Sequence, residues 1–270
     1  MSIQLHPGER NMRIRATVAA VSGAVALSAF AIPAAHADEA HGDTKISNVV
    51  VNGGKPVVLG ATGSKTFSVS FTVTDNSGVK WAQAVLFHGQ DLEHADSGAV
   101  ANTSDKRSKC TKVSATKSTC TATYTLKAGS NLVNKVAGTW KVWAIAQAKD
   151  NNYVQKDAVK TFQAQRQSKL TVDAAPEPVK KGKALTVTGA LTRANWDAAK
   201  YSGYAGQPVK LQFRKNGSSS YTTLKTVTSD SRGNLRATTT ATADGYYRFT
   251  YAGTSTTPAV SAAGDFVDVQ

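Results

Sequence analysis

Apolar and polar residues alternate with a period of two along most of the chain after residue 44, and the period of an amphipathic helix is nearly absent. Phe67, Val69, Phe71 and Val73 show the alternation most clearly. In the first half the pattern predicts strands at 45–51, 67–73, 79–88, 108–113, 118–126, 138–149 and 158–165. In the second half it predicts strands at 170–174, 184–193, 208–215, 221–229, 233–243, 245–252 and 265–269. The chain therefore reads as two successive runs of short strands.

Short strands separated by turn residues are typical of a sandwich of two antiparallel sheets with immunoglobulin-like topology. The two halves also share a motif, since GTWKV at 138–142 matches GYYRF at 245–249. In such a fold this strand carries an aromatic residue that packs at a corner of the core, so Trp140 and Tyr247 are expected in the two cores. The sequence thus predicts an all-β protein with two tandem immunoglobulin-like β-sandwich domains.

The domains are predicted at 45–166 and 168–270, and a short polar link near Arg166–Ser168 should limit their relative freedom. Residues 38–44 are expected to be a flexible N-terminal tail.

The segment before residue 38 has the features of a secretory signal peptide. A cationic head at 13–15 is followed by an apolar run at 18–32. Pro33 then ends this run, and an A-x-A site lies at 35–37. A membrane anchor is the alternative, but a spanning helix needs about 20 apolar residues and this run is shorter. We therefore expect residues 1–37 to be a cleaved signal peptide with an upstream extension, and translation starts at Met1 or Met12. No later segment is apolar enough to span a membrane, so the mature protein is expected to be secreted and extracellular.

Charge suggests a class of partner. After residue 37 the chain has 29 Lys and Arg against 17 Asp and Glu, a net charge of +12 that the two domains share equally. A diffuse positive field favours encounters with polyanions, so an anionic cell-wall polymer or glycan is the expected partner. Nucleic acid is not expected, because the protein is exported and has no basic–aromatic recognition motif. The simpler interpretation is a basic surface that only keeps the protein soluble. The sequence does not determine the oligomeric state.

Cys110 and Cys120 are the only cysteines. In an oxidising compartment two such residues usually pair, so we predict a structural disulfide between neighbouring strands. A zinc site is not expected, because there is no C-x-x-C motif and histidines are few.

Motifs of catalysis are missing from the sequence. There is no G-x-S-x-G, S-x-x-K or H-E-x-x-H. His88 and His94 lie near three acids, Asp91, Glu93 and Asp96, which would suit a metal or an acid–base pair. The segment 89–98 is more simply a solvated polar connection. We therefore predict that the protein is not an enzyme and needs no cofactor, with calcium as the one alternative.

Two turns are candidates for calcium. Asp75 and Asn76 follow the second strand, and Asp150 and Asn151 follow the sixth, so in an immunoglobulin-like sandwich both turns emerge at the same end. Their oxygens could then supply part of the ~6–8 ligands that calcium takes. The alternative is that these residues occur there because turns favour them.

The predicted loop at 194–207 carries three large aromatic residues, Trp196, Tyr201 and Tyr204. They could form a stacking platform for a sugar ring, with Asn195 or Asp197 bonding a hydroxyl. Alternatively, they fold back and cap the end of the sandwich, because aromatic side chains bury large areas.

The residues at 206–214, 224–227, 233–235 and 245–253 resemble the immunoglobulin-like modules of secreted actinobacterial proteins. The first module, from Ile46 through the DNSG turn at 75–78 to Phe162, is similar to exported actinobacterial domains without an assigned activity. Some proteins of this kind carry a calcium-binding label. The resemblance implies a secreted, non-catalytic binding or structural protein of the cell envelope or extracellular space. A calcium-binding protein and a carbohydrate-binding module are the alternatives.

Overall fold

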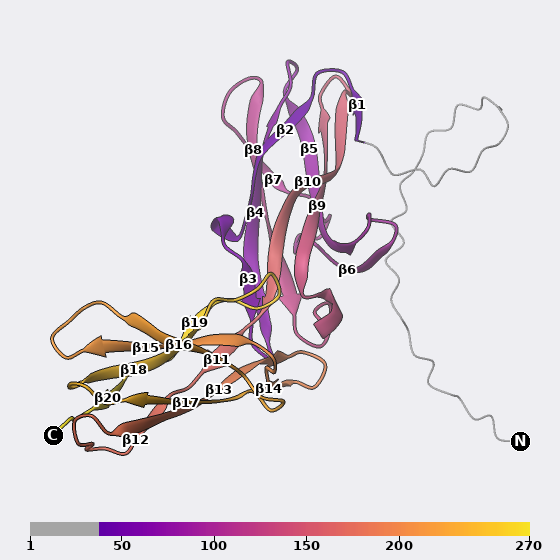
Figure 1. Ribbon diagram of the computed structural model, residues 1–270. Helices are drawn as coiled ribbons and strands as arrows, with labels where there is room; N and C mark the ends of the chain where they lie inside the picture. The colour runs from indigo at the N-terminus through magenta and orange to yellow at the C-terminus, as the bar shows by residue number, and fades with distance from the viewer. Residues whose placement is uncertain (1–37) are drawn as a thin grey trace, which may run out of the picture.

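The computed structural model describes residues 38–270, so the signal peptide expected at 1–37 lies outside the described residues. Those residues form twenty β-strands and two short 3₁₀ helices, η1 (Asn52–Gly54) and η2 (Asn134–Val136), arranged as two domains that meet at an angle (Figure 1). Within this part of the chain no helix has the length and apolar character to cross a bilayer.

Two facing sheets build domain 1, residues 38–166. One has the order β1-β10-β9-β5-β6, formed by Glu39–His41, Tyr153–Arg166, Gly138–Ala148, Val79–Gly89 and Ala95–Val100, with β3 (Val57–Leu59) parallel to β10. The other has the order β2-β4-β8-β7, formed by Lys45–Val51, Ser64–Thr74, Lys117–Lys127 and Lys109–Lys112. The second sheet has the A-B-E-D order of an immunoglobulin-like sandwich, and the first has the G-F-C order with a strand added at each edge, β1 beside β10 and β6 beside β5. The fold predicted for this half is confirmed.

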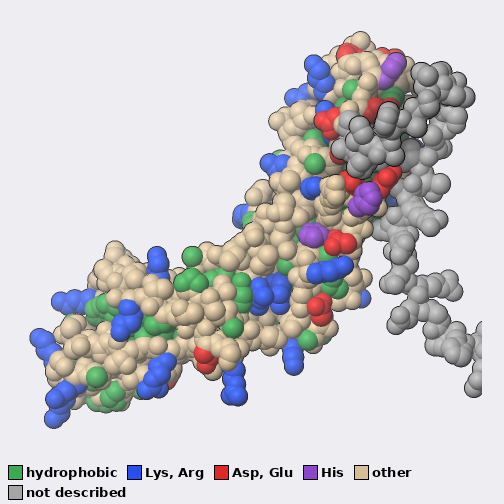
Figure 2. All heavy atoms as spheres, turned by 45° about the vertical axis from the view of Figure 1, so that its right-hand side comes forward, with side chains coloured by type: hydrophobic (Ala, Val, Ile, Leu, Met, Phe, Trp, Pro, Cys, Tyr) green, Lys and Arg blue, Asp and Glu red, His purple; other side chains and the backbone are tan. Residues whose placement is uncertain are grey.

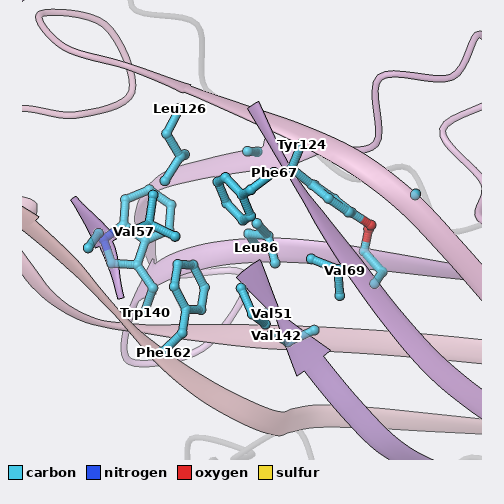
Figure 3. Packing of buried hydrophobic residues seen from close by; sticks show 14 of the residues in the cluster. Val51, Val57, Phe67, Val69, Leu86, Tyr124, Leu126, Trp140, Val142 and Phe162 are labelled. Carbon is cyan, nitrogen blue, oxygen red and sulfur yellow. The ribbon is translucent and has the colours of Figure 1, made fainter. Parts of the chain in front are cut away.

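Aromatic and branched side chains from both sheets fill the core of domain 1 (Figure 3). Trp140 is fully buried, as predicted, and its indole N–H donates to the Val136 carbonyl at 2.8 Å. The buried Tyr124 hydroxyl donates to the Ala84 carbonyl at 2.9 Å. Both polar atoms are thus satisfied, which removes the penalty of burying them.

Strand β5 turns its small residues to this core. Ala82 and Ala84 face inward together with Leu86, and Trp81, Val85 and Phe87 lie on the opposite face. The Tyr124 hydroxyl bonds to the Ala84 carbonyl, so the buried tyrosine packs where β5 presents small side chains.

Domain 2, residues 168–270, repeats the plan. In its first sheet β13 (Ala184–Asn195) is central and pairs with β11 (Ser168–Leu170), β12 (Asp173–Ala175), β14 (Lys200–Gly203) and β17 (Asn234–Thr240). The second sheet has the order β16-β15-β18-β19, with β20 also on β18; these are Thr222–Thr228, Pro208–Lys215, Gly245–Tyr251, Val260–Ser261 and Asp265–Val267. Tyr247 is 1% exposed in the core between them, as predicted. The protein is therefore an all-β pair of tandem sandwiches.

Short edge strands are the main difference from the predicted elements. Residues 38–44 are not a free tail, since Glu39–His41 form β1 against β10 and Thr44 is buried. Strands β6 and β14 likewise occupy segments predicted as loops. Each of these strands is held by hydrogen bonds to a longer neighbour, so none needs the alternating pattern that makes a strand visible in the sequence.

Cys110 and Cys120 form the predicted disulfide, with an S–S distance of 2.02 Å. They lie directly opposite each other on β7 and β8, so the bond fixes a short edge strand to the sheet. A structural disulfide fits an oxidising compartment.

Replacing both cysteines, Cys110→Ala/Cys120→Ala, should lower the free energy of unfolding by about 2–3 kcal/mol, because the bond closes a short loop in the unfolded chain. Denaturant titration measures this change. A reductant should destabilise the wild type by a similar amount and leave the variant unaffected. Equal stability of the two proteins would show that the bond does not support the fold.

The junction between the domains is built around Trp196, at the β13–β14 turn of domain 2. Its side chain is 1% exposed and packs within the core cluster of domain 1. The indole N–H donates to the Gly60 carbonyl at 2.9 Å, and the backbone N–H donates to Asn134 Oδ1 at 3.0 Å. Domain 2 therefore completes the core of its neighbour.

The link between the domains is buried as well. Arg166 is 8% exposed, and its Nε–H donates to the Ala194 carbonyl at 2.6 Å. Burial, with the nearby charge of Arg193, lowers the pKa of Arg166 to about 10. Backbone bonds run from Arg166 to Thr256 and from Ala194 to Gln167. The polar link is thus packed against and hydrogen-bonded to both domains.

Trp196→Ala should destabilise domain 1, although the residue belongs to domain 2, by about 3–5 kcal/mol for loss of a buried tryptophan. The other three tryptophans, Trp81, Trp140 and Trp143, all lie in domain 1, so fluorescence in the variant reports unfolding of that domain alone. Leu224→Ala, at an exposed position of domain 2, is the matched control. If the unfolding midpoint followed by fluorescence is the same in Trp196→Ala as in the wild type, the shared core is contradicted.

Candidate functional site

Three turns meet at the end of domain 1 that lies away from domain 2 (Figure 1). They connect β1 to β2, β4 to β5 and β9 to β10. Each contributes one carboxylate, and ligand oxygens of Asp43, Asp75 and Asp150 all lie within 4.8 Å of one another. The sequence predicted that the turns of Asp75 and Asp150 would emerge together, and the structure brings these two side chains side by side.

Asp75 is the buried member of the cluster, with 3% exposure. Its Oδ1 accepts bonds from the Ser77 backbone N–H at 2.8 Å and the Ser77 hydroxyl at 2.6 Å, and its Oδ2 accepts from the Thr44 hydroxyl at 2.7 Å. Burial opposes ionisation, but these hydrogen bonds outweigh it and hold the pKa of Asp75 below its usual range. The carboxylate is therefore charged and fixed in position near neutral pH.

Asn152 joins the two exposed members of the cluster. Its amide nitrogen donates to Asp150 Oδ2 at 2.9 Å and to Asp43 Oδ1 at 3.5 Å. Gly42 allows this approach, since it has a φ of 83° and a Cβ there would collide with the Asn152 side chain. The β1–β2 turn can thus carry Asp43 up to the other two turns.

The asparagines predicted as ligands are placed differently. Asn76 is exposed, and Asn151 Oδ1 accepts a bond from Lys80 Nζ at 3.5 Å. Within residues 38–270 neither side chain hydrogen bonds to the three carboxylates. Asp43 takes their place, and it was missed because its segment was expected to be a free tail.

The cluster suits a hard divalent cation. Calcium binds oxygen at about 2.3–2.6 Å, so oxygens less than 5 Å apart can share one ion. Among the described residues no lysine or arginine lies within ion-pair distance of these carboxylates. Half a turn of the Asn152 amide would present its oxygen as a further ligand. Backbone carbonyls and water would have to complete the ~6–8 ligands.

The histidines and acids near β6 form two separate pairs. His88 Nδ1 lies 2.7 Å from Asp96, and His94 Nδ1 lies 2.8 Å from Asp91. In the part of the chain that the structure describes, no group of three metal-ligating side chains includes them.

The loop aromatics predicted to bind a sugar lie at the junction. Trp196 is enclosed by domain 1, which corrects its prediction as part of an exposed platform, because burial there satisfies its ring and its N–H together. Tyr201 also packs on the domain 1 core, under Lys169 Nζ at 3.8 Å from the ring centre. Tyr204 packs on the domain 2 core against Tyr251, with their ring centres 5.8 Å apart. The three residues do not form one surface.

An open depression of about 400 Å³ lies in domain 2. Its lining residues are Lys181, Lys215, Asn216, Thr242, Ala243, Asp244 and Val269. This set contains no histidine or cysteine and no nucleophile paired with a base.

No protein-family model matches the sequence, and a comparison with characterised proteins gives no match. Solved structures with a similar chain course include the amphioxus IgVJ-C2 molecule, at 12% identity and a TM-score of 0.29 over 78% of this chain and 99% of that one. The D0-D1 domain of intimin is 19% identical, with a TM-score of 0.27 over 83% and 98% of the two chains. Three N-terminal domains of the bacteriophage RB49 outer capsid protein Hoc are 15% identical, with a TM-score of 0.27 over 84% and 59%. Similarity at this level carries no argument about function.

Asp75 should make the stability of domain 1 sensitive to acid. Its pKa is lower in the folded protein than in the unfolded one, so its stabilising contribution is complete above pH ~4 and is lost as the pH falls further. Asp75→Asn should be less stable than the wild type at pH 7 and should lose less stability between pH 5 and pH 3. Unfolding titrations in the presence of a chelator measure this, with Asp105→Asn as the control. If the free energy of unfolding falls equally steeply with pH in the wild type and in Asp75→Asn, the stabilising role of the Asp75 carboxylate is contradicted.

Proposed function

We propose that this is a secreted, non-catalytic protein that binds an anionic polymer of the cell envelope or extracellular space through two rigidly joined immunoglobulin-like domains. The observation that carries the proposal is the amount of unpaired positive charge. Among residues 38–270 only Lys135 and Lys156, of 29 lysines and arginines, form an ion pair with a described carboxylate. On the face drawn in Figure 2, basic side chains are spread over both domains, and most acidic ones lie on domain 1.

Unpaired surface cations attract polyanions and accelerate their encounter. The predicted signal peptide and the disulfide support an extracellular location.

Co-sedimentation of the protein without residues 1–37 with purified cell walls tests the proposal. We expect retention at low salt and at least a tenfold loss of bound protein at high salt, because exposed charges are screened. A neutral β-sandwich protein of similar size is the control. Failure to sediment at any salt concentration would contradict binding to the envelope.

Calcium binding is a second candidate, favoured by the convergence of Asp43, Asp75 and Asp150. A ligand that binds only the folded state at 100 times its Kd stabilises it by about 2.7 kcal/mol. Calcium should therefore raise the melting temperature, and a chelator should reverse the rise.

Asp43→Asn/Asp150→Asn should abolish this calcium effect without breaking the Ser77 and Thr44 bonds of Asp75. Asp105→Asn should keep the effect. A wild-type melting temperature that is the same in calcium and in chelator would contradict the candidate.

A further inference from the structure

One face of domain 2 carries aromatic and cationic side chains in place of ordinary polar ones. In the sheet of β15, β18 and β20, Val209, Leu211 and Phe249 face the core. The register places Arg214 opposite Tyr246 on the outer face, and the next outward pair is Gln212 and Arg248. Phe266 on β20 lies opposite Tyr246, and Tyr221 precedes β16. We call these six outward residues the Arg–Tyr face: Gln212, Arg214, Tyr221, Tyr246, Arg248 and Phe266.

Cations and rings alternate along this face. The Arg248 guanidinium lies 3.7 Å from the centre of the Tyr221 ring, and Arg214 lies 5.4 Å from the same ring. Arg214 also lies 4.1 Å from the centre of the Tyr246 ring, which in turn packs against Phe266 at 5.2 Å. The two guanidinium carbons are therefore at most about 9 Å apart. Contacts with the rings and the hydrogen bonds of both side chains restrict where the two guanidinium groups lie.

The two arginines have hydrogen-bond capacity left for a ligand. Arg248 donates through Nε to Gln212 Oε1 at 3.0 Å, and Arg214 donates to the Ser218 carbonyl at 2.7 Å. Each guanidinium has five N–H donors, and in the described chain neither has a carboxylate within ion-pair distance. Two like charges are thus held close together and without a counter-ion, an arrangement that an incoming anion would stabilise.

Gly264 makes room for this arrangement. A Cβ on Gly264 would collide with the Tyr221 hydroxyl and press against Tyr246. The absence of a side chain lets Tyr221 lie across the sheet beside Arg248. Phe266 remains 37% exposed at the end of the row, so part of an apolar ring is open to solvent.

These groups fit a particular ligand chemistry. Planar guanidinium groups bind carboxylates through paired hydrogen bonds, and exposed aromatic rings pack against the C–H faces of sugars. A neutral glycan would leave the two cations without a partner, and a polyphosphate would make no use of Phe266. We propose that the Arg–Tyr face binds an acidic polysaccharide whose sugar rings carry carboxylates. This inference rests on the proposed function, since it names the surface and the polymer class for binding at the envelope.

The binding of polygalacturonate to the whole chain without residues 1–37 tests this proposal. Arg214→Gln/Arg248→Gln should weaken binding at least tenfold, and Lys180→Gln/Lys181→Gln should weaken it less than twofold, although it removes the same charge from the same domain. Arg214→Lys/Arg248→Lys keeps the charge but not the planar group, so it should also weaken binding, and it tests the need for that group even if the glutamine variant does not fold. Phe266→Ala should weaken binding without changing its salt dependence.

Binding of other polymers separates the contribution of the sugar rings from that of charge alone. The fully methyl-esterified polymer should bind at least tenfold more weakly than polygalacturonate. Polyphosphate or single-stranded DNA could bind as tightly as polygalacturonate and lose that binding in Arg214→Gln/Arg248→Gln. This result would overturn the assignment to a polysaccharide. Equal losses of binding in Arg214→Gln/Arg248→Gln and in Lys180→Gln/Lys181→Gln would overturn the assignment of binding to the Arg–Tyr face.

The same variants distinguish this inference from the proposed function. If cell walls retain the wild type and Arg214→Gln/Arg248→Gln equally, the proposed function stands and the Arg–Tyr face is wrong. If the face binds polygalacturonate but cell walls do not retain the wild type, the binding surface stands and the envelope location is wrong.

Discussion

The insertion of Trp196 into the core of domain 1 is the contact on which the arrangement of the whole molecule depends. A buried tryptophan removes about 150–250 Å² from water, which corresponds to roughly 4–6 kcal/mol at 25 cal/mol per Å². Asn134 and Gly60 satisfy the polar atoms that enter with the ring, so little of that stabilisation is lost to desolvation. Each domain has its own strand order, but their cores are not independent.

This junction fixes the two candidate binding regions relative to each other. The carboxylate cluster lies at the free end of domain 1, and the Arg–Tyr face lies on the outer sheet surface of domain 2. The two regions have opposite charge and would take different ligands, a cation and a polyanion. With a rigid connection, a polymer bound on domain 2 would have a defined orientation relative to domain 1. No conformational entropy of the junction would be lost on binding.

Alternation of residues was enough to predict the long strands, and β2 and β15 have the predicted bounds. The short strands β1, β6 and β14 were missed because their neighbours, not their own residues, hold them. The burial of Trp196 was one of two alternatives in the sequence, but its entry into the core of domain 1 could not be predicted, because the sequence pattern does not show which domain receives the ring. Asp43 was missed for a similar reason, because β1 had no pattern of its own. Asp75 and Asp150 were found because topology alone places their turns at one end.

Residual dipolar couplings of backbone amides in the chain without residues 1–37 test most directly whether the two domains form one body. The account predicts that a single alignment tensor fits the couplings of both domains, in two alignment media and at low and high salt. Separate tensors of different magnitude for residues 38–166 and 168–270 would show independent motion, and would contradict the shared core at Trp196.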